Sequence, residues 1–313
     1  MIQIPTAKRL LIDVPVEPAQ GSRFQPTGFP DLGAATFERP TADGLATTSN
    51  LIVESRQSVA NHLEKVCVDA DNHLVSCLSG LPYVSVKRDG VELTNSLLEA
   101  HRLNSVYIEK EDGGKFHKQL TEAIGYDAKK PHDFRKLAGA LFLYDPNSLI
   151  HGTFLESIAG VLRVPRLVSG FVEAEGIERV PFGGVKNDRV TAAKDGDKDA
   201  KAGYGNVPFH REDFTARTIT AYFNIDLQQL RSYALGSAGE NLLFALSLWK
   251  IQAFLDEGLR LRTACDLVVS GTPRVRPGDY ALPGRAVLEE QLPGLIDACH
   301  AKFASPPITV VAA

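Results

Sequence analysis

Arginine and amide side chains stand beside glycine- and proline-rich turns, a combination that can hold an anion. The first such stretch is the loop GSRFQPTGFPDLG (residues 21–33), which carries Arg23 and Gln25. Its prolines lack the amide hydrogen that a helix or a central strand needs, and its glycines favour turns with positive φ. The glycine amides and Arg23 can line an anion site, while Phe24 and Phe29 can anchor the loop or stack on a ligand. A well-anchored turn without a ligand is the alternative.

Further polar and basic residues recur along the chain. Gln57 and Asn61 are four residues apart in ESRQSVANHLE, so on a helix they share one face. The other candidates are His151 in IHGTF and two arginines around Pro165, Arg163 and Arg166. Four more lie in or just after the glycine turn PFGGVKND: Phe182, Lys186, Asn187 and Arg189. Such residues suit a protein that holds single-stranded nucleic acid by its phosphates and stacks aromatic side chains on its bases. A solvated helix face and a structural histidine are the alternatives.

Catalytic motifs with a fixed spacing are missing from the sequence. It has no GxxxxGK[ST] phosphate loop, no GxSxG nucleophile elbow and no HExxH zinc helix, and GYGNVP supplies only the first two glycines of GxGxxG. The aspartate triplet within 195–199 resembles the start of a calcium loop, but Ala200 stands in place of the required glycine and Asn206 in place of the final glutamate. The four cysteines are too widely separated for a CxxC pair, and they predict neither a zinc site nor disulfides. We therefore expect no catalytic residue, no metal and no cofactor.

Length and charge restrict the class of protein further. The chain of 313 residues is 44% hydrophobic and 23% charged, which predicts a globular protein with a sizeable core. Its formal net charge of −4 argues against a strongly basic, free-standing nucleic-acid binder, although a local basic groove remains compatible with it. No apolar run approaches the roughly 20 residues of a membrane span, and the first residues lack the hydrophobic region of a secretory signal. These features predict a cytoplasmic protein with reduced thiols and no membrane partner.

Hydrophobic periodicity predicts strands and helices that interleave irregularly. Strands are expected at residues 8–16, 81–88, 105–108, 216–227 and 265–271, and helices at 50–66, from about 96 towards 105, at 115–124, 133–143 and 237–253. The sequence PFGGVKND predicts a turn or hairpin tip, and the polar stretch at 191–208 predicts a mobile loop. Because the spacing lacks the regular alternation of a doubly wound fold, we expect an α+β protein with long insertions.

Four ordered blocks of sequence resemble one known family. They are GSRFQPTGFPDLGAATF, ESRQSVANHLE, HGTFLES, and RVPRLVSGFVEAEG with FGGVKND, within roughly residues 8–230. In this order and at this spacing they resemble the backbone RAMP subunit of type I-U (also called I-G) CRISPR Cascade complexes. The resemblance implies a single RAMP domain over residues 1–313, in which an RRM-like (ferredoxin-type) antiparallel sheet carries large thumb- and finger-like insertions.

The resemblance also implies a function and partners. Copies of the chain would stack as a helical filament along one CRISPR RNA, grip its backbone and present its bases for pairing with target DNA, together with other Cascade subunits. The blocks contain most of the candidates named above: Arg23, Gln57, Asn61, His151, Arg163, Arg166, Lys186 and Asn187. Residues 182–185 are the expected thumb tip. His62 stands where we expect a basic residue after the asparagine of its block.

Two other functions remain open. Relatives in other CRISPR types cleave RNA, and such an enzyme needs a general acid or base, or a metal ligand, beside the scissile phosphate. Asp188 and His210 are the candidates for that role. An interaction scaffold would instead assemble without nucleic acid.

Overall fold

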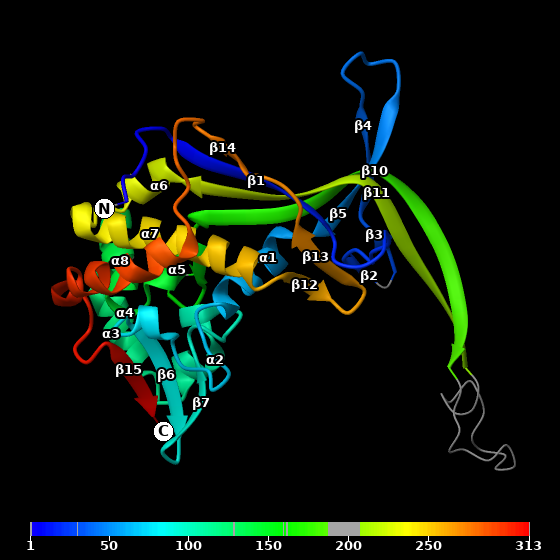
Figure 1. Ribbon diagram of the computed structural model, residues 1–313. Helices are drawn as coiled ribbons and strands as arrows, with labels where there is room; N and C mark the ends of the chain where they lie inside the picture. The colour runs from blue at the N-terminus through cyan, green and yellow to red at the C-terminus, as the bar shows by residue number, and fades with distance from the viewer. Residues whose placement is uncertain are drawn as a thin grey trace, which may run out of the picture.

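A central antiparallel sheet organises the computed structural model, which describes residues 2–29, 31–127, 129–158, 160, 162–186 and 207–312 (Figure 1). Four strands and two helices form its centre, in chain order β1 (Arg9–Pro18), α1 (Arg56–Lys65), β10 (Val168–Lys186), β11 (Val207–Asp226), α7 (Gly236–Asp256) and β13 (Cys265–Val269). All neighbouring strands are antiparallel. The spatial order β13-β1-β11-β10 confirms the RRM-like, ferredoxin-type sheet expected from the sequence.

Further strands widen this sheet at both edges. On one side β5 (Thr47–Glu54) pairs with β10, and β4 (Thr36–Pro40) pairs with β5. On the other side β12 (Leu259–Arg262) pairs with β13, and β14 (Arg274–Arg276) pairs with β1. The loop after β1 contains the two-residue strands β2 (Gly28–Phe29) and β3 (Gly33–Ala34).

Helices cover one face of the central sheet. On β1, Leu10, Ile12, Val14 and Val16 alternate with more exposed residues and are almost fully buried. Helix α1 and α5 (Pro146–His151) contact β10 and α7, and Figure 1 shows the three helices together below the strands. Helix α8 (Arg285–Asp297) also packs on α7, in addition to α1 and α5. With neighbours on several sides, α7 is apolar around nearly its whole circumference. In the part of the chain that the structure describes, no helix combines the length and apolar character needed to cross a membrane.

The segment between α1 and β10 forms a large insertion. Its strands β6 (Tyr83–Arg88) and β7 (Val91–Asn95) share a sheet with β15 (Ile308–Ala312), so the last strand of the chain lies beside the insertion (Figure 1). Its helices are α2 (Val106–Lys110), α3 (Lys115–Ile124), α4 (Phe134–Tyr144) and α5, and the short strands β8 (Thr153–Leu155) and β9 (Leu162–Val164) pair at its end. Helix α6 (Leu227–Ser232) joins β11 to α7, and single 3₁₀ turns lie at Ser76–Leu78, Arg102–Asn104 and His300–Lys302.

Three elements expected from periodicity are wrong, while the others named above are present. Instead of a helix from about residue 96 towards 105, the chain makes turns that end in the 3₁₀ turn Arg102–Asn104. Residues 50–54 end strand β5 instead of beginning a helix, because they pair with β10 and bury Leu51 and Val53. Residues 105–108 begin α2 instead of forming a strand. The Ser105 hydroxyl caps that helix by accepting a hydrogen bond from the Tyr107 amide.

Strands β10 and β11 continue beyond the sheet as a two-stranded arm (Figure 1). Residues 182–185 lie inside β10, opposite 208–211, so the expected turn and thumb tip at these residues is wrong. The two glycines serve packing between strands: a Cβ on Gly184 would lie 3.0 Å from the Phe209 ring, and one on Gly183 would lie 2.7 Å from the Phe209 carbonyl oxygen. The loop expected at 191–208 lies outside the described residues, except that 207 and 208 begin β11.

Replacing Gly170 with alanine should destabilise the core. A Cβ at this position would lie 2.8 Å from side-chain carbons of both Val59 on α1 and Phe223 on β11. We expect Gly170→Ala to lower the free energy of unfolding by about 1–3 kcal/mol in urea denaturation. Gly139→Ala is the matched control, because Gly139 lies in α4 with open space around its Cβ position, and this change should leave stability equal or slightly higher. Equal unfolding free energies for Gly170→Ala and the wild type would contradict this packing.

Candidate nucleic-acid interface

An open cavity of about 740 Å³ lies where α1, the turn between α5 and β8, and strand β9 come together. We call it the arginine cavity. Its lining includes three arginines and two histidines but only one carboxylate: Arg102, Arg163, Arg166, His101, His151 and Glu156. Four residues selected from the sequence line it, namely Gln57, His151, Arg163 and Arg166. The cavity therefore gathers positive charge in a chain whose net charge is negative.

Arg163 is held over an aromatic ring. The antiparallel pairing of β8 and β9 places Arg163 directly opposite Phe154. The guanidinium carbon lies 4.3 Å from the centre of the Phe154 ring, which is a cation–π contact. Arg163 is exposed, and within the described ranges no ion pair includes it or Arg166. Its charge is therefore presented to solvent in a fixed orientation.

Arg166 links the cavity to the amide face of α1. Its Nη2 donates a hydrogen bond to Gln57 Oε1, and Gln57 Nε2 donates to Asn61 Oδ1 over 3.2 Å. Its Nε donates to the His151 carbonyl oxygen over 3.3 Å. Burial lowers the pKa of Arg166, but a guanidinium stays protonated at neutral pH. Three side chains predicted from the sequence thus form one hydrogen-bonded row, in which Gln57 and Asn61 are exposed.

A glycine makes the turn that shapes this cavity. Gly152 follows α5 with a φ of +77°, a conformation that favours glycine. A Cβ at Gly152 would lie 2.8 Å from the Val164 carbonyl oxygen and 3.1 Å from the Arg166 backbone nitrogen. No side chain fits between this turn and the segment after β9, which explains the glycine in the block HGTFLES.

A buried ion pair lies beside the cavity. Arg102 donates from Nε and Nη2 to the two carboxylate oxygens of Glu64, over 2.6 and 2.8 Å, and from Nη1 to the Gly152 carbonyl oxygen over 2.9 Å. Arg102 and Glu64 are both buried. Sequence reasoning missed Arg102, because no glycine-rich turn or basic neighbour marks it and its partner is 38 residues away.

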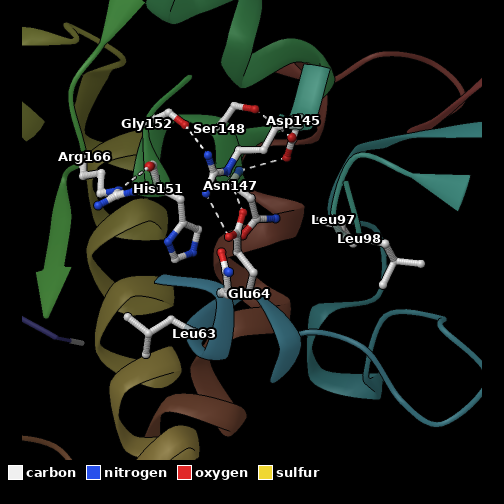
Figure 2. Close-up of polar contacts among 12 residues, drawn as sticks. Leu63, Glu64, Leu97, Leu98, Asp145, Asn147, Ser148, His151, Gly152 and Arg166 are labelled. Atoms are coloured by element: carbon white, nitrogen blue, oxygen red, sulfur yellow. Dashed lines mark hydrogen bonds and ion pairs between the residues drawn. The ribbon is translucent and has the colours of Figure 1, made fainter. Parts of the chain in front are cut away.

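His151 lies inside the protein. Its side chain is 1% exposed, and Nε2 lies 2.9 Å from Lys250 Nζ on α7. Burial first, and then the positive charges of Lys250 and Arg102, hold the pKa of His151 well below its usual value, so the ring is neutral at pH 7. Figure 2 shows the ring turned inward below the Gly152 turn. The expected contact of this side chain with RNA does not fit that position, and only the backbone carbonyl oxygen of His151 meets Arg166.

Three other candidates meet at the base of the arm, outside the lining of the arginine cavity. The Arg23 guanidinium lies 5.3 Å from the centre of the Phe182 ring and 3.6 Å from the Asp213 carboxylate. Gln25 Oε1 accepts a hydrogen bond from Arg211 Nη2 over 2.5 Å, and backbone hydrogen bonds also join this loop to β11. The loop GSRFQPTGFPDLG is therefore anchored to the arm, and the charge of Arg23 is partly balanced.

The last candidates follow the described part of β10. Lys186 is the final residue of that strand, and the structure describes its backbone alone; Asn187 and Arg189 lie outside the described residues. Over the described ranges, no cluster of histidine, cysteine, aspartate or glutamate side chains has the arrangement of a metal site.

Comparison with models of protein families shows the family to which the chain belongs. Residues 10–179, more than half of its length, match the family described as CRISPR-associated protein GSU0053. The chain belongs to this family. The match confirms the CRISPR-associated resemblance carried by the four sequence blocks. It extends from β1 into β10, so the whole lining of the arginine cavity falls within the GSU0053 family segment.

One solved structure illustrates how distant the structural similarity is. The chain is similar to a chain described as "CRISPR RNA-guided surveillance complex, pre-nicking", with 14% sequence identity and a TM-score of 0.43. The similarity covers 83% of this chain and 73% of that one. No curated protein matches the chain.

Replacing Arg102 should destabilise the protein strongly, because Glu64 would remain buried without its partner. We expect Arg102→Met to lower the free energy of unfolding by about 3–5 kcal/mol. Arg88→Met is the matched control: Arg88 pairs with Glu111 but its side chain is 53% exposed, so this change should cost about 0–1 kcal/mol. Urea denaturation measures both changes, and comparable destabilisation by the two variants would argue against a special role for the buried pair.

Stability should fall as the pH drops below the usual pKa of histidine. Between the lowered pKa of folded His151 and about 6.5, the unfolded chain binds one more proton than the folded chain. The stability that neutral His151 contributes is therefore complete above about pH 6.5 and is lost on acidification. The slope from His151 is about 1.4 kcal/mol per pH unit. His151→Gln should remove that slope in urea unfolding between about pH 7 and 5, whereas the exposed-site control His300→Gln should keep it. Identical slopes for the wild type and His151→Gln would refute this assignment.

Proposed function

We propose that this protein is a non-catalytic CRISPR RNA-binding backbone subunit of a Cascade effector complex. Membership of the CRISPR-associated GSU0053 family supports a role in such a complex. The observation that carries the proposal is the arginine cavity, in which Arg163 and Arg166 adjoin an exposed row of amides. Arginines bind phosphate through several fixed donors, and amides bind sugar or phosphate oxygens without demanding a base sequence.

The modest charge of the chain suits repeated use of this site. One copy needs to hold only a few nucleotides, and affinity accumulates when several copies lie on the same RNA. We propose that copies assemble as a helical filament along one guide, with other Cascade subunits at its ends. Sequence would then be read by pairing of the guide with target DNA, while the protein reads the RNA backbone.

The buried histidine of the cavity is not placed to cleave RNA. Of the two histidines in the lining, His151 is buried and neutral against Lys250, so it is not placed to exchange a proton with bound RNA, whereas His101 is exposed. The carboxylate of the lining, Glu156, is exposed and shares the cavity with Arg163 and Arg166, whereas Arg102 is paired with Glu64.

RNA binding should depend on Arg163. We expect the chain, produced together with a CRISPR array, to carry guide RNA in a large particle. With protein freed of nucleic acid, Arg163→Gln should weaken binding of single-stranded RNA, and the slope of log K against log salt should become shallower by about 0.7 for each phosphate that the variant no longer neutralises. Titration of a labelled RNA over a salt series measures both quantities.

Arg88→Gln is the control, because Arg88 ends β6 in the insertion and does not line the arginine cavity. It should bind RNA as the wild type does. Protein without RNA after production with the array, and without binding at low salt, would favour the scaffold function instead. Metal-dependent cleavage of the bound RNA by the purified chain would overturn the non-catalytic part of the proposal.

A further inference from the structure

The sheet face turned away from the helices carries a pair of stacked aromatic rings. Phe171 on β10 and Tyr222 on β11 are directly opposite in the register, with ring centres 5.0 Å apart and ring planes inclined by 25°. Their neighbours Gly170 and Phe223 point to the other face, where a Cβ on Gly170 would meet Val59 of α1. Because side chains alternate along a strand, Phe171 and Tyr222 face away from α1. Neither ring is fully buried.

Arg56 extends this pair to a row of three flat groups. It is the first residue of α1 and is exposed. Glu54, two residues earlier, pairs with Val172, so the chain passes the edge of β10 beside Phe171. The Arg56 guanidinium carbon lies 4.3 Å from the centre of the Phe171 ring, within cation–π distance. We call Arg56, Phe171 and Tyr222 the aromatic row.

Acidic side chains on this face are balanced by arginines. Glu175 pairs with Arg39 over 2.8 Å and with Arg217 over 2.5 Å. Burial raises the pKa of Glu173, and the positive charges of Arg56 and Arg39 act against that rise. Asp13, opposite Tyr222 on β1, pairs with Arg276 over 2.9 Å. Four arginines thus neighbour three carboxylates beside the aromatic row, so the charges named here leave one positive charge in excess.

We propose that the aromatic row is a stacking site for the nucleobases of single-stranded RNA. The inference rests on the proposed RNA-binding function and adds a second kind of contact to it, because the arginine cavity would hold phosphates and the row would hold bases. Aromatic rings and guanidinium planes stack on every base, so the site tolerates a guide of any sequence. Arg56 directly precedes Gln57, which lines the arginine cavity, so one RNA strand can reach both sites at the start of α1.

RNA without bases separates the two kinds of contact. The probes are an oligouridine and an RNA of the same length whose nucleotides are abasic, so that both carry the same phosphates. Tyr222→Leu keeps apolar bulk but removes the ring, and we expect it to weaken oligouridine binding about 5- to 100-fold for each base no longer stacked. Its affinity for the abasic RNA and its salt dependence should equal those of the wild type. Tyr107→Leu is the control, because Tyr107 is an exposed tyrosine on α2 in the insertion, and it should bind both probes as the wild type does.

Photo-crosslinking of the wild-type chain gives a second measurement that does not depend on the folding of a variant. RNA carrying 5-iodouridine should form adducts at Tyr222 or Phe171, identified by mass spectrometry of the digested protein. If the wild type binds RNA, but Tyr222→Leu affects both probes alike or neither and the crosslinks lie elsewhere, the aromatic row is not a base site and the proposed function stands. If the wild type binds neither probe, the proposed function and the aromatic row both fail.

Discussion

The buried ion pair between Arg102 and Glu64 joins the parts of the chain that build the arginine cavity. Glu64 belongs to α1, Arg102 to the insertion, and the carbonyl oxygen of Gly152, which accepts the third hydrogen bond, to the turn after α5. Burying two charges costs several kcal/mol for each ion, and only close pairing with additional hydrogen bonds offsets that cost. Other placements of the insertion against α1 would leave a charge buried alone. The insertion is therefore fixed in one position, and Arg163 and Arg166, at its end, are fixed with it.

A second buried cation beside this pair is accommodated without a carboxylate. Lys250 on α7 donates to the Leu63 carbonyl oxygen over 3.3 Å and lies 2.9 Å from His151 Nε2. A neutral imidazole can accept from an ammonium, whereas an imidazolium would repel it. The low pKa of His151 follows from the same arrangement. Below the cavity, positive charge is thus held by carbonyl oxygens, one carboxylate and a neutral ring. Exposed cations such as Arg163 remain for an external anion.

Sequence reasoning found the parts of this site that are marked locally. Arg163 and Arg166 flank a proline, and Gln57 and Asn61 follow helical spacing, so a pattern within a few residues revealed them. Sequence reasoning missed Arg102 and Arg56, because each acts through a partner that is distant in the chain. Arg102 pairs with Glu64, and Arg56 lies over the Phe171 ring. The same limit explains the two glycines of PFGGVKND. They suggest a turn when taken alone, and only the Phe209 ring of the facing strand explains them inside β10. The ferredoxin-type order of the sheet depends on strands far apart in sequence, and the resemblance of four ordered blocks predicted it where periodicity could not.

The first turn of α1 connects the arginine cavity to the aromatic row. Ser55 caps the helix at the point where β5 leaves the edge of β10. Successive helical residues point about 100° apart, so Arg56 lies over Phe171 on the open face of the sheet while Gln57 reaches Arg166 in the arginine cavity. A cap of one hydroxyl and one pair of adjacent residues thus sets the path between the arginine cavity and the aromatic row. The buried side chains of the same helix, among them Leu63 and Glu64, fix that turn against the core and the insertion. Its position is therefore determined by the folding of the chain itself.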